Sequence, residues 1–328
     1  MQIVIIGGGV IGLSIAFELA LFHPDWQITI VERGEIGRGA SWSAAGMLAP
    51  TAEGLTGTLA QLGYASRNLY PQWIDRVQKR AGISCGYWCC GIIQPSGDRS
   101  HPQYVSGSEL ARYQAGLAIE SALWIPDDSQ VDNRQLVLAL ELANRSLGVV
   151  MRQGVAVHSL TIRQHQVVGV ETSAGTISAD RYILTTGAWT AELLPQPISP
   201  RKGQMLSVFD PDRSLGRVIY GAGIYLVPRQ DGRIIVGATV EDCGFQGGNT
   251  AWGINYLLSG AIQLYPAIAH MKITETWWGF RPYAPQEELI LGASAYPNLL
   301  LALGHYRNGI LLAPITAQKI SQHLRDSL

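Results

Sequence analysis

The sequence begins with a glycine pattern that suits the binding of a dinucleotide. Gly7, Gly9 and Gly12 satisfy GxGxxG between an apolar run and a segment with helical spacing. Gly7 permits a tight turn, Gly9 lets a pyrophosphate approach the backbone, and Gly12 lets the helix pack on the strand. Glu32 follows about twenty residues later, where a carboxylate can accept hydrogen bonds from the ribose of an adenosine. A glycine-rich turn without a ligand would not need the helix, the second strand and the terminal glutamate as well.

This motif alone does not distinguish FAD from NAD, since both cofactors contain an ADP half. The segment after the second strand, from Arg38 to Leu48, is rich in small residues, hydroxyls and backbone donors. Such a segment suits close contact along a long dinucleotide, but an ordinary turn has the same composition. The residues by themselves therefore predict a dinucleotide site and leave the choice of cofactor open.

Two arginines and a tyrosine are candidates for binding a carboxylate. Arg307 lies between Gly304 and Gly309, directly before an apolar helix, so its guanidinium can lie at the floor of a pocket. A planar fork of donors suits a carboxylate. For Arg281 the alternative is an ion pair that anchors its loop. For Tyr225, cross-strand packing in a hairpin is nearly as good an explanation as a ligand contact.

A β-α-β unit is needed to position the glycine motif. Gln2 to Ile6 is an apolar run, Gly12 to Phe22 has helical spacing, and Gln27 to Val31 returns to β-branched residues. The two strands should be parallel, with a right-handed connection. Further elements are expected as a helix at Asn133 to Leu147, strands at Val149 to Met151, Val167 to Thr172 and Arg181 to Thr185, a hairpin of Ile224 to Arg229 with Arg233 to Ala238, and a last helix after Asn308.

The expected fold class is α/β, with a doubly wound, Rossmann-type domain for the dinucleotide and an α+β, sheet-rich domain for the substrate. No internal repeat or linker composition appears, and the glycines are spread among turns, so the two domains should be interleaved. We assign residues 1–76, 131–198 and 279–328 to the dinucleotide domain. Residues 77–130 and 199–278 are assigned to the substrate domain.

Composition and charge narrow the class of function. The formal net charge of the 328 residues is −1 with the charges scattered, so neither nucleic acid nor a membrane surface is an expected partner. Gly, Pro or charged residues interrupt every apolar run before about 18 residues, and the first such run lacks a basic start, so a cytoplasmic location is expected. The four cysteines match no metal or redox spacing, so they should be reduced and no metal site is expected.

Motifs beyond the glycine turn extend over nearly the whole chain. They are TTGAW at Thr185–Trp189, YLVPR at Tyr225–Arg229, GAT at Gly237–Thr239, WGFRP at Trp278–Pro282 and GHYRNGILLAP at Gly304–Pro314. With the N-terminal elements, they resemble the FAD-dependent amino-acid oxidases of the D-amino-acid oxidase and glycine oxidase type. The last block is most similar to the thiamine-pathway glycine oxidases and is the most specific motif in the sequence.

The resemblance implies a cofactor and a set of site residues. Monomeric sarcosine oxidases attach their flavin through a late cysteine, whereas no cysteine here follows Cys243, so the FAD should be held non-covalently. Arg281 and Arg307 match positions that bind the substrate carboxylate, and Tyr225 matches a tyrosine that closes over it. The residues implied to bind the FAD are Gly7, Gly9, Val10, Ile11, Gly12, Glu32, Arg33, Ala40, Ser41, Ala45, Gly46, Met47, Val157, Gly187, His305, Tyr306, Arg307, Asn308, Gly309, Ile310 and Leu311.

The implied reaction is the oxidation of a small amino acid by O2. Glycine, O2 and water would give glyoxylate, ammonia and hydrogen peroxide, or the imine would serve thiamine thiazole synthesis. Hydride transfer from a neutral amine requires no protein base at the α-carbon, so His305 is assigned no acid–base role and no residue is assigned as catalytic. The expected partners are the substrate and O2, and family members are often homo-oligomers.

The chain departs from the glycine oxidase pattern near the expected pocket. The run Tyr283 to Glu288 replaces a Gly-Thr-x-Asp-Gly turn, Gly223 stands where the thiamine-pathway enzyme has a histidine, and Val240 replaces a methionine. A sarcosine oxidase or a small D-amino-acid oxidase therefore remains an alternative. Outside the enzymes, a flavin-binding redox sensor is the alternative, although a sensor has no need of two arginines that clamp a carboxylate. An NAD-dependent dehydrogenase is a weaker alternative, and a yellow colour of the purified protein would exclude it.

Overall fold

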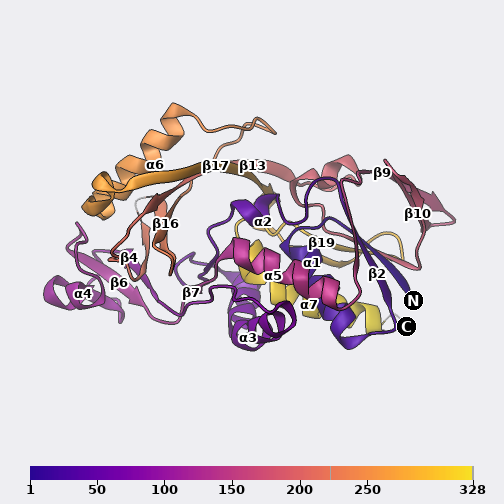
Figure 1. The fold of residues 1–328 in the computed structure, drawn as a ribbon, viewed down its shortest axis with the longest axis horizontal. Helices are drawn as coiled ribbons and strands as arrows, with labels where there is room; N and C mark the ends of the chain where they lie inside the picture. The colour runs from indigo at the N-terminus through magenta and orange to yellow at the C-terminus, as the bar shows by residue number, and fades with distance from the viewer. Residues whose placement is uncertain (222, 327–328) are drawn as a thin grey trace.

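The computed structural model describes residues 1–221 and 223–326, and its largest sheets are one of six strands and one of eight (Figure 1). The strands of the first are β1 (Gln2–Ile6), β2 (Gln27–Glu32), β8 (Val150–Gln153), β12 (Arg181–Leu184), β18 (Ile290–Ala293) and β19 (Leu299–Leu303). Their order is β18-β19-β12-β1-β2-β8. All neighbouring strands are parallel except β18, which pairs antiparallel with β19 at one edge.

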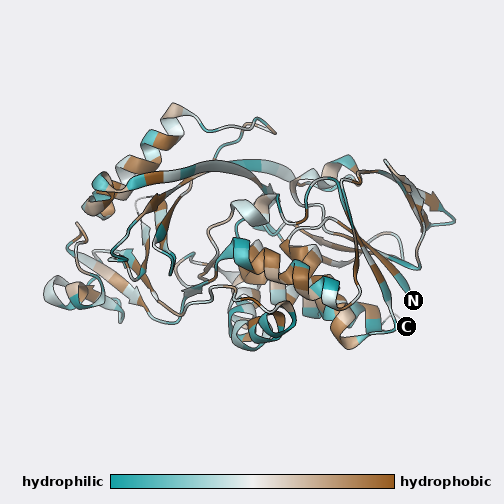
Figure 2. Ribbon diagram, viewed as in Figure 1, coloured by the Kyte–Doolittle hydropathy of each residue, from teal (hydrophilic) through white to brown (hydrophobic). Residues whose placement is uncertain are grey.

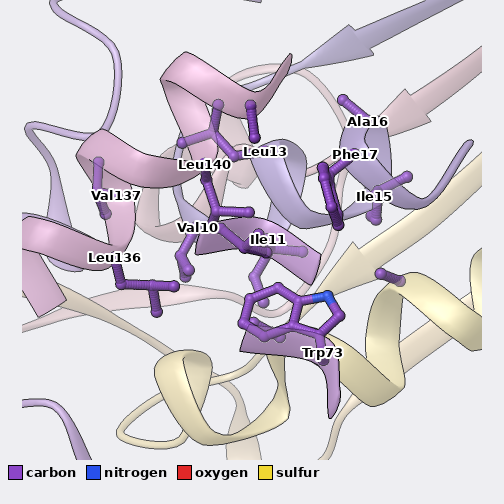
Figure 3. Close-up of a cluster of buried hydrophobic side chains, with 14 of the residues drawn as sticks. Val10, Ile11, Leu13, Ile15, Ala16, Phe17, Trp73, Leu136, Val137 and Leu140 are labelled. Carbon is purple, nitrogen blue, oxygen red and sulfur yellow. The ribbon is translucent and has the colours of Figure 1, made fainter. Parts of the chain in front are cut away.

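Helices cover one face of the six-stranded sheet. They are α1 (Val10–Phe22), α3 (Gly57–Ala81), α5 (Asn133–Ser146) and α7 (Gly309–Asp326). Ile3 and Ile5 of β1 join the core beneath these helices. Figure 3 shows Trp73 of α3 and Leu136 of α5 beside the apolar side chains of α1. The side chain of Asp132 caps α5 by accepting hydrogen bonds from two backbone N–H groups of its first turn.

A small sheet covers the opposite face. Its strands are β9 (Val157–Arg163), β10 (Gln166–Thr172) and β11 (Gly175–Ile177), all antiparallel. Val167 and Val170 of β10 pack with Val4 and Ile6 of β1. Because both faces of β1 are buried, its sequence is a continuous apolar run rather than an alternating one. The expected parallel α/β fold is confirmed, with strands in place of helices on this second face.

The eight-stranded sheet forms the second part of the molecule. Its strands are β4 (Ile92–Pro95), β5 (Tyr104–Ser106), β6 (Ser121–Ile125), β13 (Ser199–Phe209), β14 (Val218–Gly221), β15 (Ile224–Pro228), β16 (Arg233–Gly237) and β17 (Lys272–Tyr283). Their order is β17-β13-β16-β15-β14-β4-β6-β5. Helix α6 (Ala251–Leu264) packs on one face through Leu257 and Ala261, and α4 (Gly107–Tyr113) lies beside β5 and β6. The expected hairpin is confirmed, since β15 and β16 pair antiparallel.

Short elements complete the described chain. They are α2 (Ala40–Ser43), β3 (Met47–Leu48), β7 (Ser129–Gln130) and the 3₁₀ turns η1 (Gly187–Glu192), η2 (Pro266–His270) and η3 (Pro285–Glu287). Figure 2 shows hydrophobic residues gathered on the central helices and on the strands that they cover. Within the described ranges, no helix combines the length and the apolar character needed to cross a bilayer.

Helices α3 and α6 were not among the predicted elements. Helix α3 contains Pro71, which commonly ends a helix, and α6 contains Gly253 and Gly260 in a region that we expected to be sheet. Both helices are stabilised by packing, α3 through Tyr70, Trp73 and other buried residues, and α6 against the eight-stranded sheet. Tertiary contacts therefore outweigh the weak local signals here.

The domain division remains a proposal. The six-stranded sheet draws its strands from residues 1–76, 131–198 and 279–328, which we propose as the dinucleotide domain. The eight-stranded sheet draws its strands mainly from 77–130 and 199–278, the proposed substrate domain. Helix α3 and strand β17 run across two of these boundaries.

Candidate active site

A single cavity of about 700 Å³ connects the glycine turn with the two arginines. Cofactor and ligand sites commonly have volumes of roughly 300–1,000 Å³. The predicted site residues that line it are Gly7, Gly9, Val10, Ile11, Glu32, Arg33, Ala40, Ser41, Ala45, Gly46, Met47, Val157, Gly187, Tyr225, Arg281, His305, Tyr306, Arg307, Asn308, Gly309 and Ile310. Gly12 and Leu311 do not line it. The fold therefore brings the lining residues together from distant parts of the chain.

The glycine turn has the geometry that a closely approaching phosphate needs. Gly7 has a φ of +111°, and a Cβ there would lie 2.5 Å from the carbonyl oxygen of Thr185. A Cβ on Gly12 would run into the carbonyl oxygen of Gly7, so Gly12 allows α1 to pack on the turn rather than touching a ligand. Gly9 is the residue before α1 and has no side chain to cover the helix N-terminus. The cavity can therefore accept an anion at that helix end.

Two side chains hold this turn in place. The Glu32 carboxylate accepts hydrogen bonds from Gly8 N at 2.8 Å and from Gly34 N at 2.9 Å. Ser41 Oγ accepts one from Val10 N, the first residue of α1, at 2.9 Å. At the rim, the Arg33 guanidinium lies 3.9 Å from the ring centre of Trp189. The end of the cavity next to Glu32 thus offers backbone donors, a carboxylate and an arginine, which suits an adenosine diphosphate.

A buried arginine that was not predicted from the sequence holds the cavity wall at Ala45. Arg229, at the end of β15, is 6% exposed and donates to Ala45 O at 2.7 Å and to Asn133 Oδ1 at 3.1 Å. Burial lowers its pKa to about 10, while the nearby charge of Asp132 acts in the opposite direction. The arginine therefore stays charged at neutral pH and ties the eight-stranded sheet to the cofactor loop. Arg229 is the last residue of the YLVPR motif, and this position was the signal in the sequence that could have identified it.

The opposite end of the cavity holds the predicted carboxylate-binding residues. Arg281 on β17 donates to Thr239 O at 3.1 Å, and its guanidinium lies against Gly203, where a Cβ would displace it. Arg307, before α7, is more exposed, with Nη2 3.4 Å from Tyr306 Oη. Tyr225 is half-buried and reaches Met205 Sδ at 3.9 Å. Burial raises the pKa of Tyr225, so its hydroxyl stays protonated and can donate to a carboxylate.

His305 is enclosed and hydrogen-bonded within the protein. Its Nε2 lies 3.0 Å from Thr316 Oγ1, and the side chain is 5% exposed. Burial lowers its pKa from 6.5 to about 3, so the imidazole is neutral under ordinary conditions. This environment supports the proposal that His305 has a structural place next to the flavin and no acid–base role.

Glu53 and Tyr220 also line the cavity, and neither was predicted from the sequence. Tyr220 Oη donates to Glu53 Oε2 at 3.5 Å, a long hydrogen bond. Burial raises the pKa of Glu53, and the positive charges of Arg307 and Arg281 lower it. An isolated acid in the otherwise uncharged stretch Leu48–Leu55 was the signal that could have identified it.

Two of the three departures from the glycine oxidase pattern lie along the same cavity. Gly223 and Val240 are lining residues, and the Val240 side chain is 52% exposed. The run Tyr283 to Glu288 contains η3 and its three exposed residues, so it reaches solvent. Gly223 and Val240 therefore change the lining of the substrate end, whereas the run Tyr283 to Glu288 lies outside the lining and the glycine turn keeps the expected pattern.

The residues that line the cavity fit a flavin dinucleotide bound without a covalent link. No cysteine lines the cavity, and Cys85, Cys89, Cys90 and Cys243 are all free thiols. Across the described residues, no group of His, Cys, Asp and Glu side chains has the arrangement of a metal site. The turn around Gly7, the open end of α1 and the length of the cavity meet the needs of the pyrophosphate and of a ring system beyond it.

Comparisons with known proteins agree with this geometry. The family model described as "DAO: FAD dependent oxidoreductase" matches residues 2–323. The chain is 47% identical to the bifunctional protein ThiO/ThiG of Nostoc sp. over 98% of its length, and spans about half of that protein, 52%. It is 30% identical to the glycine oxidase of Pseudomonas putida, covering 97% of this chain and 92% of that one.

The arrangement in space is also that of solved relatives. The crystal structure of glycine oxidase from Geobacillus kaustophilus superposes with a TM-score of 0.93 at 30% identity, covering 99% of this chain and 95% of that one. A cavity built for FAD, a family match over nearly the whole chain and this similarity lead to one conclusion. The chain belongs to the DAO family of FAD-dependent oxidoreductases.

Proposed function

We propose that this protein oxidises glycine with O2 and water to glyoxylate, ammonia and hydrogen peroxide. The observation that carries the proposal is the continuity of one cavity from the dinucleotide turn at Gly7 to Arg281 and Arg307. Two cations at its far end suit a small substrate with a carboxylate. The glycine oxidases among the relatives support this choice over other amino-acid oxidases.

The proposed roles of the residues follow from their positions. Arg307 and Arg281 bind the substrate carboxylate, and Tyr225 donates a hydrogen bond to it. Holding the carboxylate would fix the orientation of the α-carbon in the cavity, and such positioning supplies much of the rate enhancement. Bound FAD would supply the hydride acceptor and the route of the electrons to O2. The neutral His305 contributes no proton transfer in this scheme.

We also propose how the product is used, in which compartment the protein lies and how it assembles. Because the chain spans about half of the bifunctional ThiO/ThiG relatives, its connection with a second activity is an inference from them. We infer that its imine product serves thiamine thiazole synthesis. The free thiols suit a reducing, cytoplasmic compartment, and a homo-oligomer is the proposed assembly.

Peroxide release tests the function directly. The purified protein should produce hydrogen peroxide with glycine in air, and its rate should be compared with the rates for sarcosine and D-alanine. All three substrates carry a carboxylate for Arg281 and Arg307, but they differ in volume and in amine substitution. A clearly higher kcat/KM for sarcosine or D-alanine would replace glycine in the proposal. No peroxide from any of them would refute an amino-acid oxidase.

The second expected result concerns the attachment of FAD. Acid precipitation of the purified protein should release all yellow colour into the supernatant, because no cysteine lines the cavity to form a thioether with the ring system. The flavin is measured by its visible absorbance in the supernatant and in the washed pellet. Colour retained in the pellet would contradict a non-covalent site.

A further inference from the structure

Glu53 is a carboxylate at the substrate end of the cavity, and the roles given above to Arg281 and Arg307 do not explain it. It lines the same cavity as both arginines and is half-buried. Burying a carboxylate is unfavourable unless a partner stabilises it. Among the described residues its hydrogen-bond partner is Tyr220, at 3.5 Å, and it forms no ion pair shorter than 4.0 Å. The carboxylate is therefore left with capacity to accept a further donor.

The turn that carries Glu53 is rigidly supported from behind. The fully buried Asp128 accepts hydrogen bonds from Thr51 N at 3.1 Å and from Ala52 N at 2.8 Å. Arg67 of α3 pairs with the other oxygen of Asp128 at 3.0 Å. The backbone N–H of Glu53 itself donates to Ala49 O at 2.9 Å. These bonds fix the backbone from which Glu53 extends into the cavity, as a preorganised binding group requires.

Charged and titratable groups from several elements surround the Glu53 carboxylate. Burial raises its pKa most strongly, Arg307 and Arg281 lower it, and Glu287 of η3 raises it. The pKa of Tyr220 on β14 is raised to about 12, so its hydroxyl is neutral and donates to Glu53. The Glu53 charge in turn helps to raise the pKa of Tyr225 on β15. The two arginines thus favour the ionised carboxylate.

We propose that Glu53 binds the ammonium group of the substrate as it enters, before the amine loses one proton to water and becomes the neutral form that is oxidised, so that this end of the cavity recognises an amino-acid zwitterion. The inference rests on the proposed function, in which Arg281 and Arg307 hold the carboxylate. An amino acid then meets opposite charge at both ends: two guanidinium groups face its carboxylate and one carboxylate faces its ammonium. A carboxylic acid without an amine meets the negative charge of Glu53 instead, and is disfavoured by repulsion as well as by the lost contact.

The alternative is that Glu53 only balances the charge of the arginines and supports the fold. The two roles differ in their effect on ligands that lack the amine. If Glu53 only balances the charge of the arginines, its loss leaves the binding of glycine and of acetate unchanged or makes both tighter, and if it only supports the fold, its loss weakens the binding of both. If Glu53 binds the ammonium, its loss weakens the binding of glycine, whereas acetate binds as before or more tightly.

The test compares the wild-type protein with Glu53→Gln, both purified with FAD. The concentration dependence of anaerobic flavin reduction gives the affinity for glycine, and titration of the visible flavin spectrum gives the affinity for acetate. Loss of a charge-assisted hydrogen bond should lower the affinity for glycine about tenfold to a hundredfold. The limiting rate of reduction should change much less, and the affinity for acetate should stay equal or rise. Equal weakening of both ligands, or unchanged glycine affinity, overturns the proposal.

Two more variants separate position from charge. Glu53→Asp keeps the negative charge on a shorter side chain and should recover part of the glycine affinity. Glu287→Gln removes an exposed carboxylate near the cavity that does not line it, and should leave both affinities unchanged. If Glu53→Gln and Glu287→Gln lower the affinity for glycine equally, the loss of negative charge near the cavity explains the result and the proposal is wrong.

The wild-type protein keeps the test informative whatever the stability of the variants. It should bind acetate at least about tenfold more weakly than glycine, and equal affinities contradict ammonium recognition. Failure of the proposed function would look different, because glycine would then not reduce the flavin at all. In that case glycine acts as an unreactive ligand, and its spectral titration against acetate still measures the preference.

Discussion

A Gly9→Val protein is expected to purify without FAD and therefore without yellow colour. Gly9 has a φ of −76°, which valine can adopt, and the nearest atom to an added Cβ is Ser41 Oγ at 3.2 Å. The fold can accept the side chain with a small shift of Ser41, but the branched methyl groups occupy the space in which a pyrophosphate approaches the backbone. The ratio of flavin to protein absorbance measures the loss, and circular dichroism measures the retained fold.

Gly97→Val provides the matched control. Gly97 is exposed, has no atom within 4 Å of an added Cβ and lies outside the cavity, so this variant should keep its full flavin content. If Gly9→Val is equally yellow, the pyrophosphate does not lie against this turn. If both variants lose their secondary structure, the effect belongs to valine in general and not to the cofactor site.

Replacing Arg307 with alanine should lower kcat/KM for glycine by at least about a hundredfold, at 1.4 kcal/mol for each factor of ten. Removing one partner of a charge-assisted pair costs on the order of 2–5 kcal/mol when the other charge stays buried. Arg307 is exposed and lines the cavity, and its side chain donates a long hydrogen bond to Tyr306, so the fold depends little on it. The variant should stay folded, yellow and reducible by dithionite.

The specificity of the loss identifies the role of Arg307. Glycinamide or a simple primary amine lacks the carboxylate, so its oxidation should be affected much less than that of glycine. Arg112→Ala, which removes an exposed arginine outside the cavity, should leave both substrates unaffected. An equal loss on glycine and the amine, or no loss on either, would mean that Arg307 does not hold a carboxylate.

The cofactor end of the site was predictable because its signals are local in the sequence. The glycine turn, α1 and Glu32 lie within the first 32 residues, and their spacing is imposed by one β-α-β unit. Arg281 and Arg307 were identified through motif resemblance, and the fold places both on the same cavity. What these residues do with a substrate remains a proposal that the variants above test.

Glu53 and Arg229 could not be predicted because their surroundings depend on long-range contacts. Glu53 meets Tyr220 across 167 residues, and no local pattern indicates which side of its turn faces the cavity. Arg229 reaches Ala45 across 184 residues, and its burial follows from the packing of the hairpin against the cofactor loop. Helix α3 was missed for a related reason, since the core that stabilises it includes residues from α1 and α5.

The order of strands in the cofactor sheet has a consequence for how the chain is made. Strand β1 pairs with β12, Ile3 opposite Arg181, and β12 pairs with β19, Tyr182 opposite Leu299. Pairings across such sequence separations must overcome the entropy of closing long loops, and they form slowly. During synthesis on the ribosome, β1 cannot pair with β12 until β12 has been made, and β12 cannot pair with β19 until β19 has been made. The strand that leads into the glycine turn is thus among the first parts synthesised, yet it gains its second neighbour only after the chain has been made as far as Leu184.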